Sequence, residues 1–461
     1  MDLGTLVTPN PRILVLAIAA VVAAGVAPAL AQATASPPPS NGLFRGSTSG
    51  ANAGQTLDVT LALSAAYDND VSVEAGPVLN QLLGADTTAQ STLLDTAAHY
   101  GWQGRDVQVR GTGTSTLRHD RFSGDISSVS HSATAGLTAR LPWRTTLFAN
   151  QTATYSPSYL YALFPRAAAI GPGEAPPAAP DSPASNFESY SYGTQMTLSH
   201  AFTRRSSVSA IAERNKTDYR GTTTGQPELD SYGMSGLFVH QVSRATNATG
   251  RYRYRSGSFV SGSGVTTGIT TETEIATEHG VDLGVAHTWR LSGARRITFD
   301  VGLGSSVVTP LDPPAEISDR GRSSRLVGQV GLAYLFGRTW QAGATYRQGV
   351  DYVAGLTEPV KTDGITAGLE GLITRRVDVL VKADYASGES ALIRNTPIFD
   401  TYTGNARLRY ALARGLAVYV GYVYYYYDFR GNTQIAPGLP QALERKGVRA
   451  GLTLLLPALG R

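Results

Sequence analysis

Seven histidines are the side chains best suited to acid–base or metal chemistry in this chain of 461 residues. None has the spacing of a H-E-x-x-H zinc motif, and no G-x-S-x-G nucleophile elbow occurs. His119 beside Asp120 could join a serine in a hydrolase triad, but a triad is assembled across space, and adjacent residues of this kind are usually solvated. The absence of cysteine excludes thiolate metal sites and cysteine nucleophiles. We therefore expect no enzyme: no catalytic residue, no metal site and no cofactor.

Charged residues form the second group that could do chemistry, and they recur at every other position of several segments. Arg251, Arg253 and Arg255 alternate with Tyr252 and Tyr254. A two-residue period places like side chains on one face of a β-strand and unlike side chains on the other. Such segments predict strands with one charged or small-residue face and one apolar face.

The same alternation continues from residue 55 almost to the end of the chain. Alternating segments of about 12 to 16 residues are joined in turn by very short links that carry arginine and by longer links rich in Gly, Pro, Ser and Asp. This rhythm of short turns and long loops is typical of bacterial outer-membrane barrels. The expected strands, 18 in number, are 55–67, 91–102, 106–118, 127–140, 144–157, 187–202, 206–219, 230–243, 246–260, 273–290, 295–308, 323–336, 340–354, 362–374, 376–388, 399–413, 416–429 and 445–457.

Composition and segment length exclude or disfavour other classes of protein. Lys and Arg number 39 against 35 Asp and Glu, and a net charge of +4 is too small to indicate a nucleic-acid surface. Outside the N-terminus, no run approaches the roughly 20 apolar residues of a membrane-spanning helix. A soluble two-sheet protein could also alternate in this way, but its strands usually have about five or six residues.

The N-terminus has the features of a cleaved export signal. An apolar run over residues 13–27 follows Arg12, and Ala29 and Ala31 supply the small-x-small pattern that a signal peptidase recognises. We expect residues 1–31 to be removed, although a retained membrane anchor is the alternative. Residues 32–54 are rich in Pro, Gly, Ser and Thr, and this composition predicts a flexible tail.

Tryptophan lies at one set of strand ends. All four tryptophans are within a few residues of short links, namely Trp102, Trp143, Trp289 and Trp340. Amphipathic aromatic rings settle at the headgroup level of a membrane, so these residues predict an inner aromatic girdle. Tyrosine beside aspartate recurs at the other strand ends, as at Tyr67, Tyr219, Tyr352, Tyr385 and Tyr424–Tyr427, and predicts an outer girdle.

The last expected strand carries a spacing of polar, glycine and apolar residues. Arg449, Gly451, Leu454 and Leu456 follow the order polar-x-Gly-x-x-apolar-x-apolar. Here the chain resembles Gram-negative outer-membrane β-barrels of the porin type, whose final strand carries such a pattern for the insertion machinery. The usual terminal aromatic residue is missing, and residues 457–461 trail behind. The resemblance covers residues 55–457 in architecture and identifies no single protein.

The expected fold is all-β, a single transmembrane antiparallel β-barrel of about 18 strands (16–18) over residues 55–461, with short periplasmic turns and long extracellular loops. In hydrocarbon every backbone polar group must be paired, so the strands must close on themselves. A barrel of this size leaves an aqueous lumen. Ten charged residues take inward positions and are expected to line it: Arg251, Arg253, Arg255, Asp300, Arg347, Glu370, Asp378, Lys382, Arg407 and Arg409.

These expectations indicate a pore in the Gram-negative outer membrane for passive diffusion of small hydrophilic solutes. The inward excess of arginine predicts a mild preference for anions. The expected partners are outer-membrane lipid and lipopolysaccharide, the barrel-insertion machinery and the solutes, without nucleic acid. Open alternatives are a barrel component of a secretion or polysaccharide-export system, an outer-membrane hydrolase and a non-membrane all-β binding protein.

The Pro- and Ala-rich segment 159–187 allows two interpretations. It could fold inward and narrow the pore, or it could be a solvated loop outside the cell, which its composition favours.

Overall fold

The computed structural model describes residues 54–68, 89–121, 126–156, 187–221, 228–262, 271–311, 322–337, 339–353, 356, 358–393, 396–430 and 441–460. The expected signal peptide with Ala29 and Ala31, nearly all of the tail 32–54 and nearly all of the segment 159–187 lie outside these ranges. Among the residues that the structure describes, no helix is long and apolar enough to cross a membrane.

Eighteen β-strands make up the described part of the chain. They are β1 (Gln55–Asp68), β2 (Ala89–Gln103), β3 (Val107–Arg121), β4 (Ile126–Leu141), β5 (Thr145–Ser156), β6 (Phe187–His200), β7 (Ser206–Gly221), β8 (Glu228–Gln241), β9 (Thr246–Gly262), β10 (Thr271–Ser292), β11 (Arg295–Pro310), β12 (Ser323–Phe336), β13 (Trp340–Asp351), β14 (Val360–Thr374), β15 (Val377–Ser390), β16 (Pro397–Ala413), β17 (Leu416–Phe429) and β18 (Ala442–Gly460). Each corresponds to one expected strand, with bounds that differ by three residues at most.

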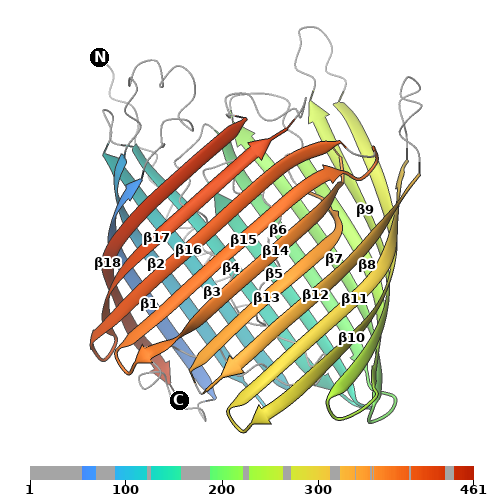
Figure 1. The fold of residues 1–461 in the computed structure, drawn as a ribbon, viewed down its shortest axis with the longest axis horizontal. Helices are drawn as coiled ribbons and strands as arrows, with labels where there is room; N and C mark the ends of the chain where they lie inside the picture. Colours follow the sequence, from blue (N-terminus) through green and yellow to red (C-terminus); the bar gives the residue numbers. More distant parts are fainter. Residues whose placement is uncertain are drawn as a thin grey trace.

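The strands close into one antiparallel barrel. Each strand pairs with its neighbours in the sequence, and the first strand also pairs with the last. At this seam Thr56 on β1 lies opposite Gly460 on β18, and the pairing continues to Asp68 opposite Gly447. Figure 1 shows the tilted strands wrapping around the barrel axis. The expectation of a single closed barrel is confirmed, and no described strand has an unpaired edge.

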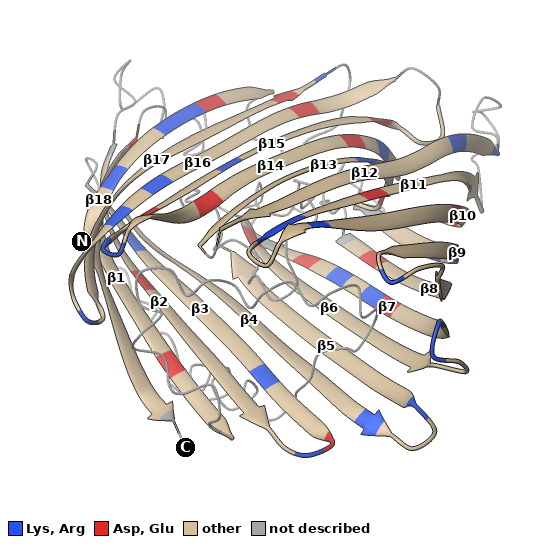
Figure 2. Cartoon of the chain, turned by 60° about the horizontal axis from the view of Figure 1, so that its bottom comes forward, with Lys and Arg blue, Asp and Glu red and all other residues tan. Residues whose placement is uncertain are grey.

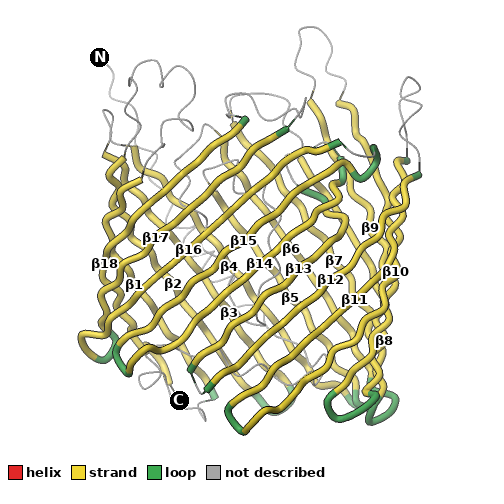
Figure 3. Tube along the Cα trace, viewed as in Figure 1, coloured by secondary structure: helices red, strands yellow, loops and turns green. Residues whose placement is uncertain are grey.

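The two ends of the barrel differ in how the strands are connected. Tight turns join the strands at one end, called here the turn end; β4 stops at Leu141 and β5 starts at Thr145, for example. The longer links leave from the other end, called here the loop end. Figure 3 shows the tight turns along the lower edge of the barrel. Because the strand number is even, Gln55 and Gly460 both lie at the turn end.

A buried ion cluster fastens the seam at the loop end. The Asp68 side chain on β1 is only 2% exposed, and its Oδ2 lies 2.8 Å from an Arg445 guanidinium nitrogen on β18 and 3.3 Å from one of Arg118 on β3. The same Arg118 nitrogen donates to the Ser91 hydroxyl on β2 at 2.9 Å. The cluster therefore ties β18, β1, β2 and β3 together on the inside of the wall.

Candidate functional site

The barrel wall has an apolar outer face and a polar inner face. Arg255 on β9 donates to the Val350 carbonyl on β13, with three strands lying between them. Only a side chain on the inner face can make such a contact, so the odd-numbered positions of β9 face inward. On the neighbouring β10 the inner positions are even-numbered. The alternating outer positions are apolar and exposed, as at Leu283, which is 68% exposed.

Strand pairing places all ten of the charged residues expected in the lumen on this inner face, since residues that lie opposite each other share a face. Asp378 and Arg409 form an ion pair on β15 and β16. Asp300 accepts from the Gln329 amide at 3.4 Å, and Glu370 accepts from Gln341. Arg251 is exposed on β9.

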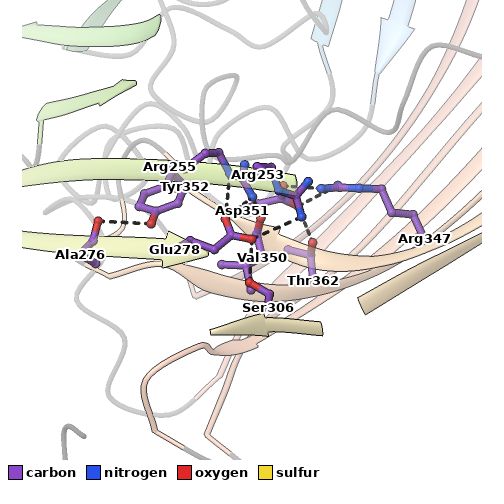
Figure 4. A network of polar contacts seen from close by, with 10 residues as sticks. All are labelled: Arg253, Arg255, Ala276, Glu278, Ser306, Arg347, Val350, Asp351, Tyr352 and Thr362. Atoms are coloured by element: carbon purple, nitrogen blue, oxygen red, sulfur yellow. Dashed lines mark hydrogen bonds and ion pairs between the residues drawn. The ribbon is translucent and has the colours of Figure 1, made fainter. Parts of the chain in front are cut away.

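Three of the predicted arginines meet in one network, drawn in Figure 4 around Glu278. The Glu278 side chain on β10 is completely buried, and its carboxylate lies 2.6 Å from an Arg255 nitrogen and 3.3 Å from an Arg253 nitrogen. The Ser306 hydroxyl on β11 donates to the same carboxylate at 2.7 Å. A buried carboxylate is tolerated when charge and hydrogen bonds compensate it, and Glu278 has both.

The third arginine enters the network from the opposite direction. Arg347 on β13 donates twice to the Asp351 carboxylate, at 2.7 and 2.9 Å. Asp351 also accepts from the Thr362 hydroxyl on β14. The Arg255 contact with the Val350 carbonyl joins this group to the Glu278 group. Side chains from β9, β10, β11, β13 and β14 are thereby linked on the inside of the barrel.

The chain turns inward where β13 ends. Val350 is fully buried against Ala276, Val308, Ala391 and Leu392. Beyond it, Val353 and Leu356 are buried in a cluster that includes Tyr427 on β17 and has Tyr219 on β7 packed against it. Strands β7 and β17 are not neighbours in the sheet. The inward segment, defined as Val350, Asp351, Tyr352, Val353 and Leu356, therefore extends into the interior and narrows it.

Tyr352 anchors the inward segment to the wall. Its ring stacks on Phe259 of β9 with centroids 5.9 Å apart, and its hydroxyl donates to the Ala276 carbonyl at 3.2 Å. Burial, and next the negative charge of Glu278, raise the pKa of the Tyr352 hydroxyl. The hydroxyl therefore keeps its proton and remains a hydrogen-bond donor.

A second link folds inward beside the first. Arg325 on β12 donates to the carbonyls of Ser390, Ala391 and Ile393, at 2.9, 3.3 and 3.1 Å. These carbonyls lie at the end of β15 and in the link that follows it. One guanidinium group thus binds three backbone carbonyls where β15 ends, and it holds this link against the inner wall.

The sequence interpretation missed Glu278, Ser306, Arg325 and the structural role of Asp351. Glu278 could have been found by pairing the neighbouring expected strands, because it lies directly opposite Arg255. The outer-girdle interpretation was wrong for Tyr219, Tyr352, Tyr425 and Tyr427, which pack in the interior clusters. It failed because the aromatic run at 424–427 alternates between the faces, and because the chain leaves the wall after Asp351.

The four tryptophans all lie at the turn end. Trp102 is near the end of β2, Trp143 is in the turn between β4 and β5, Trp289 is near the end of β10, and Trp340 begins β13. On β18, Leu454 and Leu456 are exposed on the outer face, whereas Arg449 and Gly451 alternate with them on the inner face.

The hydrolase alternative rests on His119. Its Nδ1 lies 2.9 Å from the Ser127 hydroxyl, and the side chain of Asp120 is not among those described. Within the described ranges, no group of three or more His, Asp or Glu residues could hold a metal ion.

No protein-family model and no curated protein sequence matches the chain. Similar solved structures include Pseudomonas aeruginosa OccK7 (OpdD), with 11% identity, a TM-score of 0.43 and coverage of 88% of this chain and 100% of that one. Acinetobacter baumannii OccAB2 has 9% identity, a TM-score of 0.43 and coverage of 88% and 98%. Pseudomonas aeruginosa OprD has 10% identity, a TM-score of 0.38 and coverage of 90% and 99%. At such identities the function follows from this chain's own residues.

Proposed function

We propose that the chain is a passive diffusion channel of the Gram-negative outer membrane for small hydrophilic solutes. The observation that carries the proposal is the contrast between the two faces of one closed wall. Leu283, Leu303 and Leu326 on the outer face are each more than 60% exposed, which is costly in water and favourable in hydrocarbon. Asp282, Gly302 and Arg325 are next to them on the inner face.

The size of the ring supports an open passage. A barrel of about eight strands is filled by its own side chains, whereas 16 to 18 strands leave an aqueous channel. Inner charges that are exposed, such as Arg251, then contact water and have a small desolvation cost, whereas buried ones such as Glu278 are compensated by ion pairs. The inward segment and the Arg325-bound link narrow this channel and leave the wall intact. Solute passage would depend on the width and charge of the narrowed part.

Charge at the narrowed part supports a mild anion preference. Arg253, Arg255 and Arg347 contribute three positive charges, and Glu278 and Asp351 contribute two negative ones. This network has an excess of one positive charge, and Arg325 at the second inward link adds another. So small an excess biases the concentration of small ions without forming a tight anion site. The preference is therefore expected to be weak.

The proposal includes the route to the membrane. Residues 1–31 would be removed after export, the tail 32–54 would lie in the periplasm, and the turn end would face the periplasm with the tryptophans as the inner girdle. Arg449, Gly451, Leu454 and Leu456 on β18 would be recognised by the barrel-insertion machinery. Lipopolysaccharide and lipid would contact the exposed apolar face.

Planar-bilayer recording of the purified mature chain tests the proposal. We expect stepwise insertion of open channels whose current is proportional to voltage. The same sample should run faster on a gel before boiling than after it, because a closed barrel resists detergent. A heat-modifiable protein that inserts without conducting would refute the channel. A chain that stays soluble and monomeric without detergent would refute the membrane location.

A further inference from the structure

The tight turns carry an unbalanced positive charge. By sequence, seven of the eight turns contain arginine, and Asp106 is their only acidic residue. We define the arginine collar as one residue from each of six turns: Arg105, Arg144, Arg205, Arg244, Arg375 and Arg414. All six are exposed. Figure 2 shows blue segments on the turns at the turn end, distributed around the rim.

The collar arginines have no ion-pair partner among the described residues, in contrast to several exposed cations that lie farther from the turn end. Arg214 lies 2.6 Å from Asp230, Lys446 lies 2.9 Å from Glu444, and Arg430 contacts both Asp400 and Asp428. These three exposed cations are thus neutralised by carboxylates of the chain itself. At the turn end a counter-charge has to come from outside the described chain.

Aromatic residues lie at the same level as the collar. All four tryptophans are at the turn end, and Trp143 directly precedes Arg144 in the turn between β4 and β5. Tryptophan prefers the interface between headgroups and hydrocarbon. Arginines beside such a girdle can place their aliphatic stems along the apolar wall and their guanidinium groups among the headgroups.

The turn that carries Trp143 and Arg144 adopts a costly backbone conformation. Both residues have φ of 58°, and the Thr145 amide donates to the Pro142 carbonyl at 3.3 Å. Hairpin turns with positive φ at both central residues normally use Asn and Gly, because side chains crowd the backbone there. Strain of this kind is often found where a side chain has a binding role. The turn presents an aromatic ring and a cation together at the rim.

We propose that the arginine collar binds the phosphate groups of anionic phospholipids in the leaflet that borders the turn end. Each cation is attracted to an anionic membrane surface. One guanidinium group can also donate two parallel hydrogen bonds to two oxygens of the same phosphate. Six arginines around one rim would hold a local ring of anionic lipid. The inference rests on the proposed function, because it requires the barrel to span a bilayer.

The tryptophans provide a local readout of the lipid around the collar. The protein would be reconstituted into vesicles of phosphatidylglycerol and phosphatidylcholine, with bromine on the acyl chains of one lipid at a time to quench tryptophan fluorescence. We expect brominated phosphatidylglycerol to quench as if it were enriched about threefold over its bulk fraction. High salt should reduce that enrichment, because it screens exposed charges.

Two triple variants with equal loss of charge separate the collar from general electrostatics. Arg144→Gln, Arg205→Gln and Arg244→Gln together should bring the enrichment close to bulk composition. Arg214→Gln, Arg430→Gln and Lys446→Gln, which remove three cations away from the turn end, should leave it unchanged.

Three results would each contradict either lipid binding by the collar or the proposed channel, and the experiment tells these two cases apart. Quenching by each lipid in proportion to its bulk fraction in the unmodified protein would refute lipid binding by the collar alone. An equal loss in both triple variants would also refute it. No quenching by either brominated lipid would instead refute the bilayer location and, with it, the proposed channel.

Discussion

Glu278 determines the electrostatic character of the narrowed interior at the scale of single residues. Its carboxylate is fully buried and holds two arginine side chains that would otherwise repel each other. Arg251 lies two residues before Arg253 on the same inner face of β9. It is exposed and has no ion pair among the described residues. Glu278 on β10 is thus neutralised by ion pairs, whereas Arg251 on the adjacent β9 carries a charge that can interact with passing ions.

Changing these two residues should shift ion selectivity in opposite directions. Glu278→Gln removes one negative charge with little change in shape, so reversal potentials in a KCl gradient should move toward anion preference. Arg251→Gln should move them toward cation preference, by a smaller amount because solvent screens its charge. Arg214→Gln on the outer face is the matched control and should leave them unchanged. Shifts of the same sign in both inner variants would contradict the proposed selectivity.

Sequence alternation was sufficient to place the charged side chains but not their contacts. Periodicity of two assigns Arg253 and Arg347 to an inner face without any knowledge of partners. Their meeting through Glu278 and Asp351 depends on the inward turn after β13, and that turn is set by contacts with distant strands. Such contacts have no local signature in the sequence.

Individual strands were predictable because each has two chemically different surroundings. A strand between hydrocarbon and water must alternate, and it continues as long as the alternation does. The expected strand 340–354 extended three residues too far, because β13 ends at Asp351. Val350, Asp351, Tyr352 and Val353 continue a strand-like pattern, yet the chain leaves the wall at Asp351 to bury both valines inside.

Tyr352 should control how firmly the inward segment is held. Tyr352→Ala removes the ring that stacks on Phe259 and should loosen the segment by about 3 kcal/mol. Tyr352→Phe removes only the hydrogen bond to the Ala276 carbonyl and should cost about 1 kcal/mol. Single-channel recordings should therefore show larger or noisier currents for the alanine variant than for the phenylalanine variant. Identical traces for both variants and the unmodified protein would show that the segment does not limit conduction.

At the scale of the whole molecule, stability depends on keeping the ring closed. The seam differs from the other strand pairs because its partners are not joined by a link, and Asp68 connects them through Arg445 and Arg118. Removing one member of a buried ion cluster leaves uncompensated charge among buried side chains.

Asp68→Asn should therefore destabilise the closed barrel by about 3 kcal/mol, because two buried guanidinium groups lose their shared carboxylate. The measurement is the denaturant midpoint in detergent, together with the temperature at which gel mobility changes. Asp428→Asn at the same end is a partly exposed control and should change both by much less. An unchanged midpoint for Asp68→Asn would show that backbone pairing alone holds the seam.

The pairing of β1 with β18 also has a consequence for biogenesis. The two strands come from opposite ends of the described chain, so the ring cannot seal until synthesis has delivered its final strand. Until then the sheet keeps two unpaired edges, one at β1 and one at the last strand added, and either could join a foreign sheet. A chain that ends before β18 therefore cannot close the ring through the pairing observed here, because β1 would lack its partner.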